Sequence, residues 1–229
     1  MSKPYIVDAP LFLLDYDGTL AEIVPDPETA FPHPDVPGLL QNLREKYPVY
    51  LVTGRSIKSL SQLLNVPRLE VIGVHGMEAG RLGEPATPLI TEGDLDALEV
   101  ARAQLPKISG LKVEDKGLAI ALHYRNVDIA GTDTLKAWSK KLPHGLDLLW
   151  GKQVLELRPH GYSKGRAAMR LAAEHLQATP IFVGDDTTDE EAFIAIPQGL
   201  SVKVGEGVTK ARARLLDVAS VVAYLKQYV

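Results

Sequence analysis

The chain has 229 residues, with 29 acidic and 25 basic side chains, a formal net charge of −4 and no cysteine. Hydrophobic residues make up 45% of it and charged residues 24%, which excludes an intrinsically disordered chain. The mild acidity argues against a nucleic-acid or anionic-membrane binder, since either needs a basic face, and the lack of cysteine excludes disulfides, thiolate metal sites and cysteine nucleophiles.

The N-terminal segment from Ile6 to Leu14 is mostly apolar, but Asp8 and Pro10 interrupt it and Asp15 follows it directly. Neither the apolar core of a signal peptide nor a membrane-spanning helix fits this pattern. The sequence therefore predicts a cytoplasmic protein that contacts no membrane.

Short apolar runs alternate with amphipathic stretches in both outer parts of the chain, a pattern typical of βα units around a parallel sheet. The predicted strands are Leu11–Asp15, Val49–Thr53, Leu69–Val74, Ile181–Gly184 and Leu200–Val204. The predicted helices are Val36–Tyr47, Ser56–Leu64, Lys164–Ala178 and Asp217–Tyr228. Together these elements predict an α/β, Rossmann-like core.

The middle of the chain has a different pattern, which begins with a predicted turn or linker over Arg81–Pro88. The elements expected next are the helix Asp94–Gln104, the strands Leu111–Glu114 and Leu118–Tyr124, the helix Thr132–Leu142, and the strands Leu146–Trp150 and Gln153–Arg158. This α-β-β-α-β-β order favours a small antiparallel sheet with both helices on one face. We therefore predict an inserted α+β domain over residues 83–158, which divides the core into residues 1–82 and 159–229.

Asp15 and Asp17 lie where the first predicted strand ends, in the run Asp15-Tyr16-Asp17-Gly18. Side chains alternate along a strand, so both carboxylates point the same way while Tyr16 points elsewhere. Buried carboxylates this close repel one another, so one must bind a proton or a cation must lie between them. The alternative is an ordinary Asp-rich turn.

Acidic residues also follow the predicted strand Ile181–Gly184, where the sequence continues Asp185-Asp186-Thr187-Thr188-Asp189-Glu190. Open α/β sheets bind their ligands at the carboxyl ends of the strands. Two acidic strand ends in one sheet therefore predict a shared oxygen-ligand site for a hard divalent cation, most simply Mg²⁺. Helix capping is the alternative, and it accounts for one of these acids but not for all of them.

Two further features are suited to binding a phosphate. Thr53-Gly54-Arg55 ends another predicted strand with a hydroxyl group and a backbone turn, although a plain helix start explains it as well. Lys164 begins a predicted helix, where the helix dipole disfavours a positive charge. Beside a carboxylate cluster, this lysine is better explained as a counter-charge for a bound phosphate than as solvated surface.

Four segments of the chain resemble, in the same order, the motifs of the haloacid dehalogenase-like (HAD) phosphohydrolases. They are Asp15-x-Asp17-Gly18-Thr19, Thr53, Lys164 and Gly184-Asp185-Asp186-x-x-Asp189. The resemblance implies a HAD core with an inserted cap domain of the C2 type. It implies that Asp15 is the nucleophile and forms an aspartyl-phosphate, and that Asp17 is the general acid and base. Thr53 and Lys164 would hold the phosphoryl oxygens.

The same resemblance implies that the cofactor is Mg²⁺. Asp15, Asp185 and the main-chain carbonyl of Asp17 would contact the ion directly, and Asp186 and Asp189 would act through water or by supporting the direct ligands. The residues implied in binding it are Asp15, Asp17 through its main-chain carbonyl, Asp185, Asp186 and Asp189.

The inserted segment and its flanks are similar to those of the trehalose-6-phosphate phosphatases in particular. The stretches that carry this similarity are Gly73–Glu78, Glu114–Lys116, His123–Arg125, Glu156–Pro159 and Gly161–Gly165. The similarity implies hydrolysis of trehalose 6-phosphate, with the insert as the domain that sets substrate specificity.

Residues in these stretches and at the strand ends are candidate ligands of the sugar phosphate, because charged and amide groups hydrogen-bond well to hydroxyls and phosphate. They are Gly54, Arg55, His75, Glu78, Glu114, Lys116, Arg125, Lys152, Glu156 and Arg158. An ordinary solvated surface is the alternative for those near the two predicted hairpin turns. His75 has a structural alternative, and Arg158 is placed to contact either the sugar or a neighbouring carboxylate.

The basic residues near the C-terminus do not suggest a nucleic-acid site. Lys203, Lys210, Arg212 and Arg214 are interleaved with no aromatic residue, so the pattern predicts a solvated face.

The sequence therefore predicts a Mg²⁺-dependent phosphatase whose partner is a small sugar phosphate, most directly trehalose 6-phosphate. Within the same class the alternative substrates are sucrose phosphate and glucosylglycerate phosphate. Outside it the alternatives are a phosphoacceptor signalling domain and a catalytically silent sugar-phosphate sensor. We expect a monomer, and functional coupling to a trehalose-phosphate synthase stays open.

Overall fold

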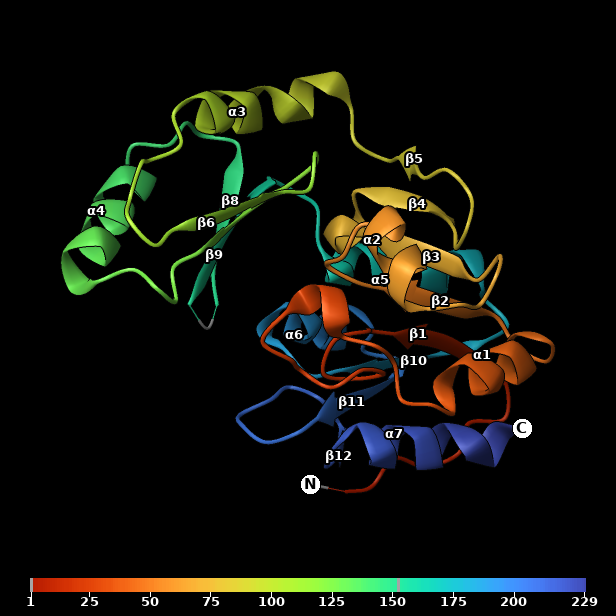
Figure 1. The fold of residues 1–229 in the computed structure, drawn as a ribbon. Coiled ribbons are helices and arrows are strands. Elements are labelled where there is room, and N and C mark those ends of the chain that lie inside the picture. Colours follow the sequence, from red (N-terminus) through yellow and green to blue (C-terminus); the bar gives the residue numbers. More distant parts are fainter. Residues whose placement is uncertain (1, 152) are drawn as a thin grey trace. The chain divides into compact units, whose positions relative to one another are not determined.

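The computed structural model describes residues 2–151 and 153–229, and the chain divides into two compact units. The first unit joins Met1–Leu89 to Ser163–Val229, and the second is Ile90–Tyr162. Figure 1 traces the elements of both units along the chain.

The first unit is built on a large sheet with helices on both faces (Figure 1). Its strands are β1 (Pro10–Leu14), β2 (Val49–Val52), β3 (Glu70–Gly73), β4 (Glu78–Arg81), β5 (Thr87–Pro88), β10 (Thr179–Gly184), β11 (Leu200–Val204) and β12 (Ala213–Leu215). Its α-helices are α1 (Val36–Arg44), α2 (Ile57–Leu63), α5 (Lys164–Glu174), α6 (Thr187–Ala195) and α7 (Val218–Leu225).

The order of the strands places a switch point in the middle of this sheet. The order is β12-β11-β10-β1-β2-β3-β4-β5, and the pairs from β12 to β3 are parallel, while β4 and β5 add an antiparallel edge. The chain proceeds from β1 to β2 and β3 on one side, and later from β10 to β11 and β12 on the other. Open α/β sheets bind ligands where the strand order reverses, which here is the carboxyl edge of β1 and β10.

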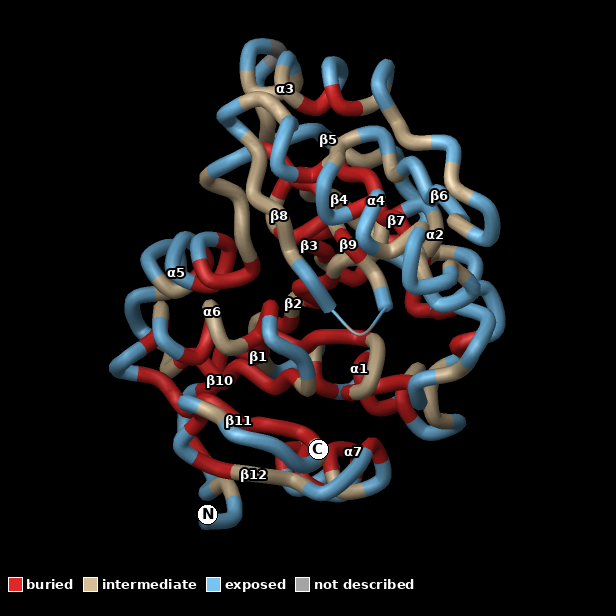
Figure 2. The backbone as a smooth tube through the Cα atoms, turned by 90° about the vertical axis from the view of Figure 1, so that its left-hand side faces the viewer, coloured by how far each residue is buried: buried red, intermediate tan, exposed pale blue. Residues whose placement is uncertain are grey.

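The two faces of the sheet are covered by different helices, as the alternation along β1 dictates. Phe12 and Leu14 pack with buried side chains of α1, α2 and α7 in one apolar cluster. Leu11 and Leu13 pack with buried side chains of α5 and α6 in another. All five residues of β1 are buried, and Figure 2 shows the central strands β1, β10 and β11 as buried tubes. A strand covered on both faces holds its C-terminal residue in a fixed place.

The second unit is an antiparallel sheet with two helices. It contains α3 (Glu92–Ala103), β6 (Lys112–Asp115), β7 (Ile120–His123), α4 (Ile129–Ser139), β8 (Leu146–Trp150) and β9 (Val154–Pro159), and the strand order is β6-β7-β9-β8. Leu98 of α3 and Leu135 of α4 share one apolar cluster with alternate residues of β7 and β9. Both helices therefore cover the same face of the sheet, and the α-β-β-α-β-β prediction is confirmed.

The structure differs from the predicted domain boundaries at residues 83 and 158. Within Arg81–Pro88, which was expected to be a turn or linker, Thr87–Pro88 form β5 and pair with β4. The large sheet therefore keeps the chain in the first unit as far as Leu89, and the second unit ends at Tyr162. A strand of only two residues is too short to show the alternation of apolar and polar side chains from which a strand is predicted.

The α/β fold with a Rossmann-like core and a separate small sheet is confirmed. Among the residues that the structure describes, none of the helices is both long enough and apolar enough to cross a lipid bilayer.

Candidate active site

The candidate site lies at the carboxyl ends of β1, β2 and β10. Asp15 follows β1 directly, and its main-chain N–H donates to the carbonyl of Val183 on β10 at 2.9 Å. Asp185 follows β10, and Thr53 follows β2. Because these strands are parallel neighbours, their last residues meet at one edge of the sheet, which is the switch point.

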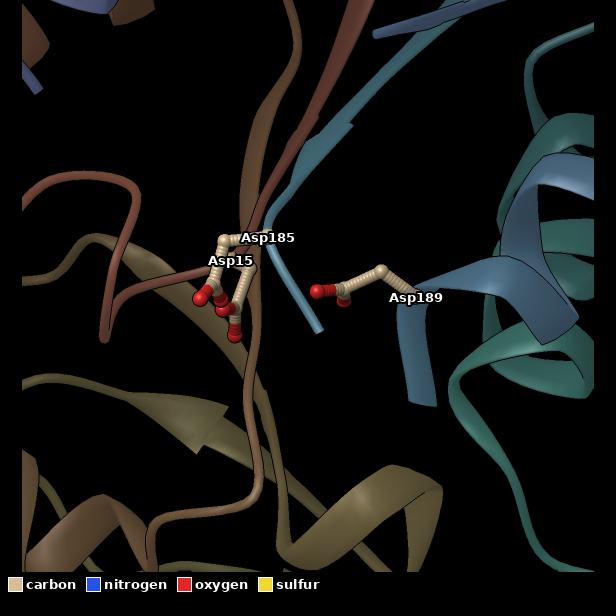
Figure 3. A group of neighbouring side chains, drawn as sticks. All are labelled: Asp15, Asp185 and Asp189. Atoms are coloured by element: carbon tan, nitrogen blue, oxygen red, sulfur yellow. The ribbon is translucent and has the colours of Figure 1, made fainter. Parts of the chain in front are cut away.

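Three carboxylates form a cluster at this edge. Asp15, Asp185 and Asp189 each offer an oxygen, and these oxygens lie within 4.8 Å of one another. In Figure 3, Asp15 and Asp185 extend side by side from their strands, and Asp189 points toward them from the first turn of α6. Asp15 and Asp189 are buried, and Asp185 is partly buried.

Lys164 supplies the positive charge of the cluster. It is the first residue of α5, is only 3% exposed, and its Nζ donates to Asp15 Oδ1 at 2.6 Å and to Asp189 Oδ1 at 2.8 Å. A buried cation at the N-terminus of a helix is disfavoured both by desolvation and by the helix dipole. The two carboxylates offset this cost: burial lowers the pKa of Lys164, but Asp15 and Asp189 outweigh it and raise the pKa.

Burial also raises the pKa of the acids. Burial raises the pKa of Asp15, with Asp189 and Asp185 acting in the same direction, whereas Lys164 lowers it. Burial, together with the charge of Asp189, raises the pKa of Asp185 to about 7. One ammonium therefore leaves the cluster of three carboxylates with excess negative charge.

We expect the stability of the metal-free protein to fall as pH rises. The pKa of Asp185 is about 7 in the folded protein and about 3.9 in an unfolded chain. Its contribution to the free energy of unfolding is therefore full below about pH 4 and is lost as pH rises through about 7. The expected slope of the free energy of unfolding is up to about 1.4 kcal/mol per pH unit. Urea unfolding with a chelator at pH 5, 6, 7 and 8 measures it. Asp185→Asn should flatten the slope, and an equally steep slope in that variant would contradict the assignment.

The donor set fits a hard divalent cation. Oxygen ligands from carboxylates are those that Mg²⁺ binds in proteins, and a cation between Asp15 and Asp185 would remove the charge excess described above. Asp189 is already engaged through both oxygens, since Oδ1 accepts from Lys164 and Oδ2 accepts from the N–H of Asp186 at 2.9 Å. Asp186 is the N-cap residue of α6, and its Oδ1 accepts from the hydroxyl of Thr187 at 3.3 Å.

Two glycines make room for the cluster. Gly18 has φ +71°, and a Cβ atom there would lie 2.3 Å from the carboxyl carbon of Asp185. A Cβ atom on Gly184 would lie 2.2 Å from the carboxyl carbon of Asp189. Real Cβ atoms do not approach other atoms this closely, so both positions require glycine for packing, and Gly18 also for its backbone conformation.

Asp17 is held by Arg55 in a two-pronged ion pair. Arg55 donates from Nε to Asp17 Oδ2 and from Nη2 to Asp17 Oδ1, both at 2.7 Å. The guanidinium carbon of Arg55 also lies 5.6 Å from the centre of the Tyr16 ring. Tyr16 is fully buried on the other side of the strand end, where its hydroxyl donates to the carbonyl of Ala30 at 2.8 Å. The pair fixes the direction of the Asp17 carboxylate.

The turn Thr53-Gly54-Arg55 is supported by the loop after β3. The N–H of His75 donates to Thr53 O and that of Val74 to Arg55 O, each at 3.0 Å. Val74 and His75 have φ of +45° and +55°, in the left-handed region where a β-branched residue such as valine is rarely found. A Cβ atom on Gly54 would lie 2.6 Å from Nε2 of His75, so the buried imidazole packs directly against this turn.

His75 and Glu78 thus have structural contacts besides their predicted role as sugar ligands. The carboxylate of Glu78 accepts from the N–H of Ile57, the first residue of α2, at 2.5 Å, and burial raises its pKa. Both residues therefore stabilise the phosphate-binding turn and the helix after it. Their contact with the sugar stays a prediction.

In the second unit, the predicted sugar ligands Glu114 and Glu156 lie on the sheet face opposite the helices. They stand in register across β6, β7 and β9, with Ala121 between them. Lys116 Nζ donates to Glu156 Oε1 at 2.9 Å, and the two side chains are 15% and 13% exposed. His123 of β7 pairs with Glu114 of the neighbouring strand β6 at 3.0 Å.

The other predicted ligands of this unit have contacts of their own. Arg158 is 3% exposed, on the same side of β9 as Glu156, with Nε 3.5 Å from a carboxylate oxygen of Asp147. Arg125 is exposed and donates to Gln153 Oε1 at 3.0 Å. Lys152 lies outside the residues that the structure describes.

Lys203 was wrongly predicted to lie on a solvated face. It is 7% exposed on β11, and its Nζ donates to the main-chain carbonyls of Asp185 and Val204. The signal that could have identified it is its position inside the apolar run Leu200–Val204, because a lysine in a strand buried on both faces needs a partner.

The chain has the fold of the HAD phosphatases, an open and mainly parallel sheet with acidic residues at its switch point. The same fold occurs in a solved phosphatase of the haloalkanoate (HAD) enzyme superfamily from Bacteroides thetaiotaomicron, at 18% identity and a TM-score of 0.67, covering 96% of this chain and 95% of that one. At this identity the likeness shows the fold alone.

The family is shown by closer matches. The family model for trehalose-phosphatase matches residues 13–214, and the chain belongs to this family. It is 35% identical to the trehalose-6-phosphate phosphatase of Escherichia coli K12 over 94% of this chain and 85% of that protein. It is 34% identical to the trehalose-phosphate phosphatase of Mycobacterium marinum over 93% of this chain, but spans only 59% of that protein's length. A crystal structure of a trehalose-6-phosphate phosphatase related protein matches with a TM-score of 0.80 at 30% identity, over 95% of this chain and 96% of that one.

Proposed function

We propose that the protein is a Mg²⁺-dependent phosphatase that hydrolyses trehalose 6-phosphate to trehalose and phosphate through an aspartyl-phosphate. The observation that carries the proposal is the buried contact of Lys164 with Asp15 beside Asp185 and Asp189, at the switch point of a chain of the trehalose-phosphatase family. This arrangement supports a role for Asp15 as a carboxylate nucleophile beside fixed positive charge.

In the first step a carboxylate oxygen of Asp15 attacks phosphorus, and the bond from phosphorus to the sugar oxygen breaks. Asp17 donates a proton to the departing oxygen, which leaves as a hydroxyl of trehalose. The hydroxyl of Thr53 and the ammonium of Lys164 bind phosphoryl oxygens and keep phosphorus in line with Asp15.

In the second step water attacks phosphorus of the aspartyl-phosphate. Asp17, now ionised, accepts a proton from this water, and the bond from phosphorus to Asp15 breaks to release phosphate. The two-pronged contact with Arg55 holds Asp17 in its ionised form, the form that accepts this proton. Asp15 and Asp17 return to their starting states.

Charge is the main obstacle to this reaction. Two unit negative charges about 4 Å apart repel by about 4 kcal/mol at an effective dielectric near 20. Lys164 offsets part of this repulsion. Bound Mg²⁺, held by Asp15, Asp185 and the main-chain carbonyl of Asp17, would supply the remaining positive charge.

Phosphate release from a panel of sugar phosphates tests the proposal. We expect trehalose 6-phosphate to be hydrolysed fastest, with turnover lost in excess chelator and restored by Mg²⁺. Faster hydrolysis of sucrose phosphate or glucosylglycerate phosphate would overturn the substrate assignment. Stable protein phosphorylation without phosphate release would instead indicate a phosphoacceptor signalling domain, and tight binding without either would indicate a sensor.

For the sugar we propose the helix-free face of the second unit, where Lys116 and Glu156 form a sheltered pair. Carboxylate and ammonium groups on such a face accept from and donate to sugar hydroxyls. The second unit is thus the substrate-specificity domain.

We expect Glu156→Ala to lower kcat/KM on trehalose 6-phosphate about 10- to 100-fold, which corresponds to the loss of one hydrogen bond to a charged group. Turnover of p-nitrophenyl phosphate should stay within about twofold of wild type, because this substrate has no sugar. The matched control is Asp96→Ala, which removes an exposed carboxylate on the helical side of the unit. Equal losses on both substrates would contradict a role in sugar recognition.

A further inference from the structure

Lys203 is a buried lysine that the reaction scheme above does not use. It lies on β11 in register with Gly184 of β10, the residue directly before Asp185. Neighbouring Val202 and Val204 belong to the apolar cluster on the opposite face of the sheet. The side chain of Lys203 therefore lies on the face of α5 and α6, next to the end of β10.

The contacts of Lys203 go to the main chain. Within residues 2–151 and 153–229, Nζ donates to the carbonyl of Asp185 and, at 2.9 Å, to that of Val204. Burying an ammonium whose hydrogen bonds go to carbonyls is costly even with the charge of Asp185 nearby, because a carbonyl dipole offsets less of the lost hydration than a paired carboxylate does. A cost of this kind in a central strand suggests a role at the site.

The contact with Asp185 fixes one peptide unit from both ends. The peptide that joins Asp185 to Asp186 has its carbonyl bound by Lys203 and its N–H bound by Oδ2 of Asp189. A peptide held at both polar groups cannot rotate, so the backbone dihedral angles next to it are restricted. The side chain of Asp185 leaves the backbone at this point and therefore has a fixed direction toward Asp15.

We propose that Lys203 is a positioning residue, which anchors the Asp185–Asp186 peptide and so holds the Asp185 carboxylate in place to bind the divalent cation. This inference rests on the proposed function, since it requires that a cation binds at Asp15 and Asp185. Lys203 acts through the main chain of Asp185 and touches neither substrate nor cation.

Charge and position predict opposite effects, which makes the proposal testable. When Asp185 is ionised, as at pH 8.5, the ammonium of Lys203 repels a cation in the cluster, so removal of its charge alone would tighten cation binding at that pH. Loss of the peptide anchor would weaken binding, because Asp185 would have to be ordered when the cation binds. Partners behind metal ligands typically contribute about 10- to 100-fold to metal affinity.

The experiment is a titration of the purified full chain with Mn²⁺, in which free Mn²⁺ is measured by electron paramagnetic resonance. We expect Lys203→Met to weaken Mn²⁺ binding about 10- to 100-fold. Half-maximal activation should require correspondingly more Mg²⁺, while KM at saturating Mg²⁺ stays unchanged. The matched control is Lys210→Met, an exposed lysine seven positions away whose loss should leave Mn²⁺ affinity unchanged.

Thermal unfolding without metal separates positioning from structural support. Replacing a buried charge by an apolar side chain of similar length is often neutral or stabilising, so metal-free Lys203→Met should unfold at or above the wild-type temperature. If this variant fails to fold, Lys203→Gln keeps one amide donor and is expected to weaken Mn²⁺ binding several-fold.

The outcomes distinguish the inference from the function on which it rests. Failure of wild type to bind Mn²⁺ would overturn the metal-dependent function. The positioning role of Lys203 would be overturned if wild type binds Mn²⁺ and folded Lys203→Met binds it equally or more tightly. If Lys203→Met does not fold, the same result in folded Lys203→Gln would overturn it.

Discussion

Asp15→Asn is expected to lower phosphate release at least about 10⁴-fold, as removal of a nucleophile does in other covalent enzymes. An amide oxygen carries no full negative charge, so it neither attacks phosphorus effectively nor yields an acyl phosphate. Asparagine has the shape of aspartate and still accepts from Lys164, so the variant should remain folded. Phosphate release at saturating trehalose 6-phosphate and Mg²⁺ measures the effect.

The control for this experiment is Asp8→Asn, which changes an exposed aspartate seven residues earlier and should leave turnover unchanged. Acid quenching of wild type during turnover should trap a phosphorylated peptide that contains Asp15. Turnover by Asp15→Asn within tenfold of wild type, or phosphorylation at another residue, would require a different mechanism.

Lys164→Met is expected to lower turnover about 10³-fold and to destabilise the metal-free protein by about 3–5 kcal/mol. The variant leaves Asp15, Asp185 and Asp189 together without the ammonium that contacts two of them. Their pKa values should rise further, so the stability of the variant should fall more steeply than that of wild type as pH rises above 4. Urea unfolding in chelator and phosphate release measure the two effects.

Two comparisons make this result specific. Lys58→Met removes an exposed lysine of α2 and should change neither quantity. Lys164→Met combined with Asp189→Leu replaces the pair by apolar side chains, so it should recover much of the stability but none of the turnover. Recovery of activity in the double variant would show that Lys164 serves only to neutralise Asp189.

Several parts of the fold follow from local patterns. The apolar runs at β1, β2, β10 and β11 are long enough to predict strands, and Ser56 and Ser163 mark helix starts, where each hydroxyl accepts from a main-chain N–H. The short strands β4, β5 and β12 lack such signals. They exist because neighbouring strands offer unpaired N–H and carbonyl groups, which only the folded sheet provides.

The candidate site divides in the same way. Strand alternation and the position of Asp15, Asp17 and Asp185 after apolar runs already place acids at one sheet edge. The contact of Lys164 with Asp15 joins residues 149 positions apart, and that of Lys203 with Asp185 joins residues 18 positions apart. The helix start at Lys164 predicted a counter-charge for phosphate beside the carboxylates, but neither the contact of Lys164 with Asp15 nor a partner for Lys203 was predicted.

The sequence by itself determined which residue types stand at the strand ends, because periodicity and turn residues act over a few positions and do not need the rest of the chain. The tertiary structure alone decided which carboxylates gather, that Arg55 holds Asp17, and that Lys203 is buried beside Asp185 rather than solvated. The physical reason is that burial and ion pairing depend on strand order, and the order β10-β1-β2 brings distant parts of the chain to one edge.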